Sequence, residues 1–130
     1  MPTIFSRIIS GEIPSYKIAE DENYYAFLDI NPVATGHTLV VPKKEIDYIF
    51  DLDDAYLSGL MLFAKKIAGA IEKAIPCKRI GITVIGLEVP HAHIHLIPLN
   101  TMSDINFSKE KMNPSAEQLS ETAHKIIKAF

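Results

Sequence analysis

A chain of 130 residues with 48% hydrophobic and 22% charged residues has the composition of a globular domain, and it lacks the polar, highly charged character of disordered chains. Its formal net charge of −3 offers no cationic field to a nucleic-acid backbone, and it contains no apolar run long enough to span a membrane. The single cysteine excludes an internal disulfide framework and a cysteine-built zinc site, and it favours a reducing, cytoplasmic location.

The first half of the chain predicts a short helix followed by three strands. Apolar residues recur at helical spacing before Gly11, which predicts an N-terminal helical turn over residues 4–9. Residues 16–19 and 24–29 are rich in aromatic and β-branched side chains and flank a polar turn, so they predict an antiparallel hairpin. Residues 37–41 predict a third strand, which ends before a proline.

The second half predicts two helices and two further strands. Asp53 is expected to cap a long helix that ends at Pro76, with an apolar stripe at steps of three or four residues. The stripe consists of Leu57, Leu60, Met61, Ala64, Ile67, Ala68, Ile71, Ala74 and Ile75. Strands are predicted at residues 78–86 and 92–99, and Asn113–Pro114 is expected to open a last helix in the cap-then-proline order. The buried stripe of that helix would consist of Ala116, Leu119, Ala123, Ile126, Ile127 and Phe130.

The order of these elements predicts an α+β fold. Strands pair mainly with their neighbours in sequence, so we expect a mostly antiparallel sheet of about five strands, one long central helix and a C-terminal helix. No internal repeat, low-complexity tract or Pro/Gly/Ser linker divides the chain, and residues 1–130 are therefore expected to form a single domain.

Histidine is distributed unevenly: three of the five histidines lie within five residues, in the run HAHIHLI at residues 91–97. A strand projects alternate residues to opposite faces, so His91, His93 and His95 are expected to share one face while the residues between them enter the core. Because histidine titrates near neutral pH, such a row can combine a neutral nucleophile with protonated neighbours that bind an anion.

Two other interpretations of the cluster stay open at this point. The three imidazoles would have no binding or catalytic role if this face of the sheet were simply exposed to solvent. They would bind zinc or iron if a further histidine or carboxylate completed the ligand set, and Glu88 is the nearest acid in sequence.

The run at residues 91–97 resembles the signature of the histidine triad (HIT) superfamily, His-φ-His-φ-His-φ-φ with φ apolar, and matches it at each position. Residues 4–14, 26–32 and 36–43 are similar to further blocks of the family, in the family's order. The resemblance extends over nearly the whole chain up to about Leu99. It implies a HIT-like fold and a homodimer with the long helix and a neighbouring strand in the interface.

The resemblance also implies a reaction at the α-phosphate of nucleoside 5′-phosphate derivatives, either phosphoramidates or dinucleoside polyphosphates, of purines such as AMP or GMP. His93 would attack phosphorus and form a nucleotidyl-histidine that water hydrolyses, with its other ring nitrogen donating to the carbonyl of His91. His91 and His95 would bind the non-bridging phosphate oxygens. His37, which by itself is typical of a strand start, corresponds to the family's fourth histidine. No cofactor or metal is implied.

A nucleotide pocket follows from the same resemblance. Asp29 would hydrogen-bond the ribose hydroxyls, and the base would lie in an apolar slot. The residues expected in that slot are Phe5, Ile8, Phe27 and Ile30. Their spacing is equally consistent with ordinary core packing.

The chain departs from the family before the histidine cluster. The family commonly places glutamine and then serine or threonine after a glycine, whereas Leu87 and Glu88 follow Gly86 here. Glu88 would either donate a proton to the leaving group, which requires a raised pKa, or be a solvated loop carboxylate. The altered pair also permits an alternative function, a nucleotide-binding regulatory module with little turnover.

Overall fold

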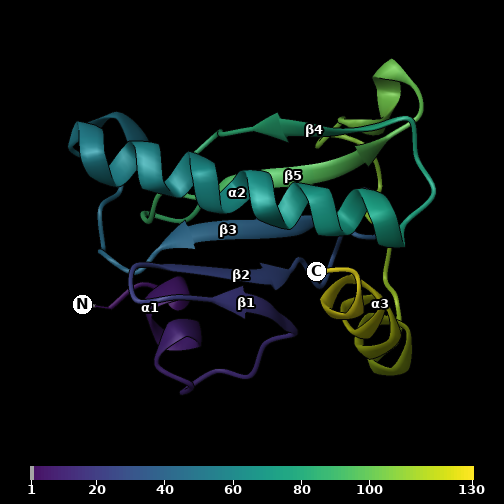
Figure 1. Ribbon diagram of the computed structural model, residues 1–130, viewed down its shortest axis with the longest axis horizontal. Coiled ribbons are helices and arrows are strands. Elements are labelled where there is room, and N and C mark those ends of the chain that lie inside the picture. Colours follow the sequence, from purple (N-terminus) through teal and green to yellow (C-terminus); the bar gives the residue numbers. More distant parts are fainter. Residues whose placement is uncertain (1) are drawn as a thin grey trace.

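The computed structural model describes residues 2–130 and contains the helices and strands in the predicted order (Figure 1). The strands are β1 (Lys17–Glu20), β2 (Tyr24–Leu28), β3 (Thr38–Pro42), β4 (Arg79–Thr83) and β5 (Ile94–Leu99). The α-helices are α1 (Ile4–Ile9), α2 (Asp54–Ala74) and α3 (Ala116–Lys128), and the 3-10 turns are η1 (Ile49–Asp51) and η2 (Met102–Asp104). All strand pairs are antiparallel, in the order β1-β2-β3-β5-β4, which confirms the α+β prediction.

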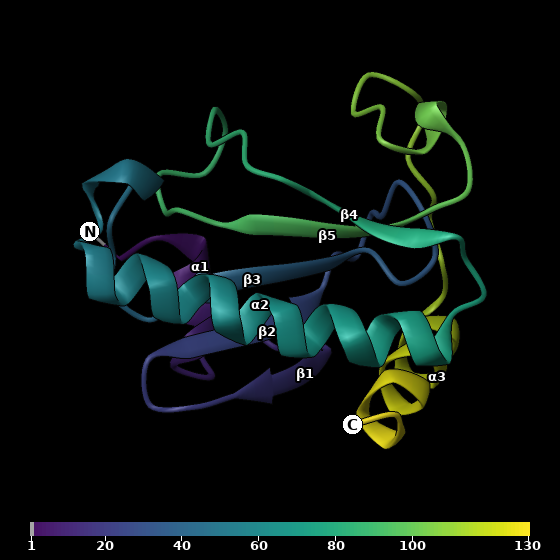
Figure 2. The ribbon, with the colours of Figure 1, turned by 45° about the horizontal axis from the view of Figure 1, so that its top comes forward.

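The sheet separates two sets of packed side chains. On one face, Val40 of β3 and Ile94 and Leu96 of β5 pack beneath α2, and α3 lies beside β1 at the end of that layer (Figure 2). Helix α1 packs through Phe5 on the other face. The prediction that Ala92, Ile94 and Leu96 enter the core beneath the helices is confirmed. Alternation along β3 and β5 thus leaves the α1 face for the remaining side chains.

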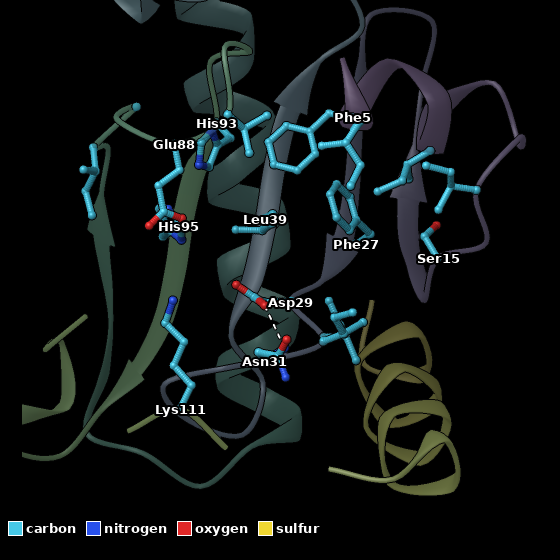
Figure 3. A pocket seen from close by; sticks show the side chains of 18 of the residues that line it. Phe5, Ser15, Phe27, Asp29, Asn31, Leu39, Glu88, His93, His95 and Lys111 are labelled. Atoms are coloured by element: carbon cyan, nitrogen blue, oxygen red, sulfur yellow. Dashed lines mark hydrogen bonds between the residues drawn. The ribbon is translucent and has the colours of Figure 1, made fainter. Parts of the chain in front are cut away.

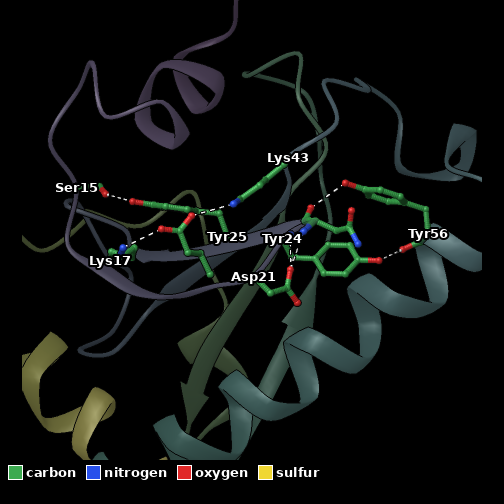
Figure 4. Close-up of polar contacts among 9 residues, drawn as sticks. Ser15, Lys17, Asp21, Tyr24, Tyr25, Lys43 and Tyr56 are labelled. Carbon is green, nitrogen blue, oxygen red and sulfur yellow. Dashed lines mark hydrogen bonds and ion pairs between the residues drawn. The ribbon is translucent and has the colours of Figure 1, made fainter.

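The hairpin of β1 and β2 is tied to the start of α2 by tyrosines (Figure 4). The Asp21 carboxylate accepts the backbone N–H of Tyr24 at 2.8 Å, which closes the polar turn. The Tyr24 hydroxyl donates to the Tyr56 carbonyl at 2.9 Å, and the Tyr56 hydroxyl donates to the Asn23 carbonyl at 2.8 Å. These reciprocal bonds fix the hairpin against the helix that covers the sheet.

Both long helices begin at a capping side chain, but only one of the two caps was predicted correctly. Asp53 accepts the Tyr56 N–H and caps α2 as expected. The prediction that Asn113–Pro114 opens the last helix is wrong. Ser115 caps α3, because its hydroxyl accepts the Gln118 N–H while the Gln118 side chain accepts the Ser115 N–H. This reciprocal pair satisfies the backbone N–H groups of Ser115 and Gln118, whereas the side chain of Pro114 has no atom that accepts a hydrogen bond.

The buried stripes are narrower than the sequence pattern predicts. On α3 only Leu119, Ala123 and Ile126 are buried. The predicted members of that stripe that remain exposed are Ala116, Ile127 and Phe130. On α2, Met61 faces outward as well. A 3.6-residue period places these side chains at the edges of the apolar stripe, beyond the reach of the sheet.

Two predicted strands are longer than the observed ones. Strand β4 ends at Thr83, which pairs with His95. Residues 84–86 leave the sheet, and Gly86 makes the turn with a φ of 73°. Strand β5 begins at Ile94, so residues 92–93 lie outside the ladder. No helix described within residues 2–130 has the length and apolar character needed to cross a membrane.

Candidate functional site

A cavity of about 460 Å³ opens on the α1 side of the sheet and is lined by residues of α1, β2, β3 and β5 and of the irregular segments between elements (Figure 3). This volume lies within the range of small-molecule sites. All four residues expected in the apolar slot line it, namely Phe5, Ile8, Phe27 and Ile30. The Phe5 ring stands edge-on between Phe27, at a centroid distance of 5.6 Å, and His93, at 4.9 Å. Phe5, Ile8 and Phe27 therefore pack in one cluster and border the cavity at the same time, whereas Ile30 borders it from an exposed position.

His93 has one ring nitrogen committed to the backbone. Its Nδ1 lies 2.8 Å from the carbonyl oxygen of His91, the partner that the family resemblance indicated. A carbonyl only accepts hydrogen bonds, so Nδ1 carries the proton and Nε2 holds a free lone pair. The side chain lines the cavity, which makes Nε2 available as a nucleophile to a bound ligand.

His95 has the opposite tautomer, because His37 stands behind it. The Val33 N–H donates to His37 Nδ1 at 3.1 Å, so the proton of neutral His37 is on Nε2, which donates to His95 Nδ1 at 2.9 Å. The remaining nitrogen of His95 is then an N–H donor, and His95 lines the cavity. His37 does not line this cavity and is 1% exposed.

These two imidazoles are uncharged at neutral pH, contrary to the expectation of protonated neighbours. Burial and the adjacent His95 lower the pKa of His37 from 6.5 to about 3. Burial and the adjacent His93 lower the pKa of His95 from 6.5 to about 4. Desolvation disfavours the imidazolium form, so His95 offers a neutral hydrogen-bond donor rather than a positive charge.

His91 does not share the cavity with His93 and His95. It is fully buried and has both ring nitrogens engaged, Nε2 with the carbonyl of Pro42 at 2.8 Å and Nδ1 with the hydroxyl of Thr3 at 2.7 Å. With both ring nitrogens engaged, His91 has no free group that faces the cavity in this structure, and its contact with phosphate oxygens stays a prediction. Its ring still lies on the α1 side of the sheet, because it packs edge-on against Phe5 at a centroid distance of 5.7 Å, as the ring of His93 does at 4.9 Å.

Asp29 follows β2 and borders the middle of the cavity, between the aromatic slot and His95 (Figure 3). One carboxylate oxygen accepts the Asn31 N–H at 2.9 Å, and the other lies 3.8 Å from His37 Nε2. Burial raises the pKa of this carboxyl group. Within residues 2–130, the cluster whose donor atoms converge to within 4.8 Å is Asp29, His37 and His95, not the row of three histidines considered as metal ligands.

Some cavity residues have no counterpart in the sequence interpretation. Glu88 lines the cavity as expected, but so do Phe107 and Lys111, from the segment between η2 and α3. The Phe107 ring packs edge-on against His95 at a centroid distance of 4.9 Å. That segment shows neither helical nor strand periodicity, so no pattern within it predicts which residues reach the cavity.

Comparison with known proteins gives consistent relatives. The model of the HIT domain family matches residues 10–102. The chain is 36% identical over 131 residues to an uncharacterized HIT-like protein of Borreliella burgdorferi, covering 95% of this chain and 94% of that protein. It is 41% identical over 96 residues to adenosine 5′-monophosphoramidase HNT1 of Saccharomyces cerevisiae, covering 73% of this chain and 61% of that protein. A crystal structure of a Hit-like protein involved in cell-cycle regulation from Bartonella henselae superposes with a TM-score of 0.86 at 34% identity, covering 98% and 96% of the two chains.

Proposed function

Because this chain belongs to the HIT domain family, we propose that it cleaves purine nucleoside 5′-phosphate derivatives at the α-phosphorus. The substrates would be AMP or GMP joined to an amine or to a further phosphate. The observation that carries this proposal is the tautomer of His93, whose Nδ1 proton is held by the His91 carbonyl beside an open cavity. The name of the yeast relative, a monophosphoramidase, supports the same chemistry.

The reaction would proceed in two displacements. His93 Nε2 attacks the α-phosphorus, a P–N bond to the imidazole forms, and the bond to the leaving group breaks. Water then attacks the nucleotidyl-histidine: its oxygen bonds to phosphorus, the P–N bond breaks, one water proton passes to the solvent, and the imidazole leaves as the free base with the P–N electron pair on Nε2. The N–H of His95 donates to a phosphate oxygen as charge builds in both steps.

His91 and His37 would be positioning residues in this scheme. The His91 carbonyl orients His93, and the ring of His91 is held by the Pro42 carbonyl and the Thr3 hydroxyl. The ring of His37 sets the tautomer of His95. Asp29 borders the cavity and would accept hydrogen bonds from the ribose hydroxyls. Glu88, an exposed loop residue at the cavity wall, is a candidate to protonate the leaving group in its acid form.

The decisive experiment follows AMP release from adenosine 5′-phosphoramidate. His93→Ala should abolish release and the nucleotidyl adduct that mass spectrometry detects on acid-quenched wild-type protein. His124→Ala, at an exposed position on α3, is the matched control and should react like the wild type. An unchanged rate in a folded His93→Ala protein would refute the proposal.

A nucleotide-binding regulatory role is the second candidate. It is favoured by the loop at the cavity wall, where Leu87 is 87% exposed and Glu88 is acidic in place of the polar pair that is common in the family. Binding of AMP or GMP without hydrolysis of phosphoramidates, dinucleoside polyphosphates or nucleotide sugars would favour this role over catalysis.

We also propose a homodimer formed through α2 and β4. Strand β4 is an edge of the sheet, and apolar side chains are exposed on both elements, including Met61, Leu62 and Ile82. Sedimentation that detects only monomer would contradict this arrangement. The single-domain organisation of residues 1–130 and a cytoplasmic location remain proposals, supported by the packing of α3 into the core and by the lone Cys77.

A further inference from the structure

We propose that Lys111 is the cation that binds the phosphate of the ligand, and that it gives the cavity its preference for a nucleotide over a nucleoside. This inference rests on the proposed nucleotide function and identifies a binding residue within that site. Lys111 belongs to the irregular segment that follows η2 and lines the cavity together with Phe107.

The charges around the cavity favour such a cation. Among the lining residues that the structure describes, Asp29 and Glu88 are acidic, and Lys111 is the one lysine or arginine. His95 is neutral, since its pKa is lowered to about 4. A phosphate monoester brings one to two further negative charges into this space, and neutral N–H donors reduce that repulsion without cancelling it.

The position of Lys111 suits this role. Figure 3 shows its side chain extending into the cavity toward the space between Asp29 and His95. His95 is the residue expected to donate to a phosphate oxygen, and Asp29 is the residue expected at the ribose. An ammonium group at this point faces the junction of sugar and phosphate, where a 5′-phosphate carries its charge.

The segment that carries Lys111 is anchored on both sides of this residue. The Met112 N–H donates to the Pro32 carbonyl at 2.9 Å, and the Phe107 ring packs edge-on against His95 and, at a centroid distance of 6.0 Å, against His37. Because Met112 is bonded to Pro32 on one side and Phe107 packs against two histidines on the other, the backbone of Lys111 is held at the cavity rim. A lysine at this position loses less freedom on binding phosphate than one on a free loop.

Lys109 provides a matched control within the same segment. It is exposed like Lys111, lies two positions earlier, and does not line the cavity. Replacing either lysine by methionine removes one positive charge and keeps the aliphatic length. The two variants therefore carry the same change in overall charge and differ only in whether that charge faced the cavity.

The test compares equilibrium binding of AMP and of adenosine by calorimetry. Lys111→Met should weaken AMP binding by about 10- to 100-fold, the usual effect of losing one charge-assisted contact, and should change adenosine binding by less than about 2-fold. Lys111→Arg should retain most of the AMP affinity, and Lys109→Met should bind both ligands like the wild type.

Three results would overturn the inference. These are an unchanged AMP affinity in Lys111→Met, an equal loss for AMP and adenosine, and an equal loss of AMP affinity in Lys109→Met. AMP is the product of the proposed reaction, so this experiment needs no turnover. A protein that binds AMP through Lys111 but releases none from a phosphoramidate would refute the proposed catalysis and leave this inference standing.

Discussion

Replacement of His37 by asparagine should make the fold less sensitive to acid. His37 is 1% exposed and lies between the Val33 N–H and the His95 ring. Its pKa is lowered from 6.5 to about 3, mainly by burial and then by the neighbouring His95. Asparagine is polar and has an acceptor for the Val33 N–H, but it does not titrate.

The sign and size of the effect follow from linkage. Because the pKa of His37 is lower in the folded than in the unfolded chain, the unfolded chain binds the proton first as the pH falls. The free energy of unfolding therefore decreases below a pH of about 6.5 and continues to decrease down to a pH of about 3. At pH 5, about 1.5 units below the unfolded pKa, His37 alone costs roughly 2 kcal/mol relative to pH 7.5.

Urea denaturation at pH 7.5 and pH 5.0 measures this contribution. Between the two pH values, His37→Asn should lose about 2 kcal/mol less unfolding free energy than the wild type. The titration of other groups is common to both proteins and largely cancels in this comparison. His124→Asn, at an exposed position on α3, should lose as much as the wild type. An equal loss in wild type and His37→Asn would refute the buried neutral state assigned to His37.

Three further substitutions test other parts of the site. Asp29→Asn should weaken AMP binding about 10-fold but 2′-deoxy-AMP binding much less, as measured by calorimetry, because a ribose hydroxyl is then missing from the contact. Phe5→Ala should lower the free energy of unfolding by about 3 kcal/mol or more, since the ring is 6% exposed and packs against the rings of Phe27, His91 and His93; a smaller loss on denaturation would contradict that packing. Glu45→Ala should speed amide hydrogen exchange at Thr3 and Ser6, because this carboxylate accepts the Thr3 N–H and the Ser6 hydroxyl; unchanged exchange would show that it does not hold α1.

Much of the fold and the site was predictable where a regular element carries the pattern. The α2 cap at Asp53, the core positions of Ile94 and Leu96, and the cavity position of His95 all follow from helical or strand periodicity. The α3 cap departs from the proline rule, because Ser115 and Gln118 form a capping box one residue after Pro114.

The remainder depended on contacts that periodicity does not encode. His91 lies on the same side as His93, against Phe5, but its ring nitrogens are engaged by the Pro42 carbonyl and the Thr3 hydroxyl, contacts that strand alternation does not predict. Lys111 reaches the cavity because the Met112 N–H pairs with the Pro32 carbonyl, a contact between residues 80 positions apart in an irregular part of the fold. Such long-range pairs between loops leave no periodic signal in the sequence.

The four buried histidines act as two pairs. One member of each pair faces the cavity, and the other orients it from behind: the His91 carbonyl holds the proton of His93 on Nδ1, and the His37 ring holds the proton of His95 on Nε2. The two imidazoles that line the cavity thereby differ in the ring nitrogen that their hydrogen bonds protonate, Nδ1 in His93 and Nε2 in His95. Protonation of His37 would place an N–H at Nδ1 opposite the Val33 N–H and a positive charge beside His95. The low pKa of His37 therefore keeps the tautomers of the two pairs different. The same burial that keeps the site in its working tautomers is what makes the fold vulnerable to acid.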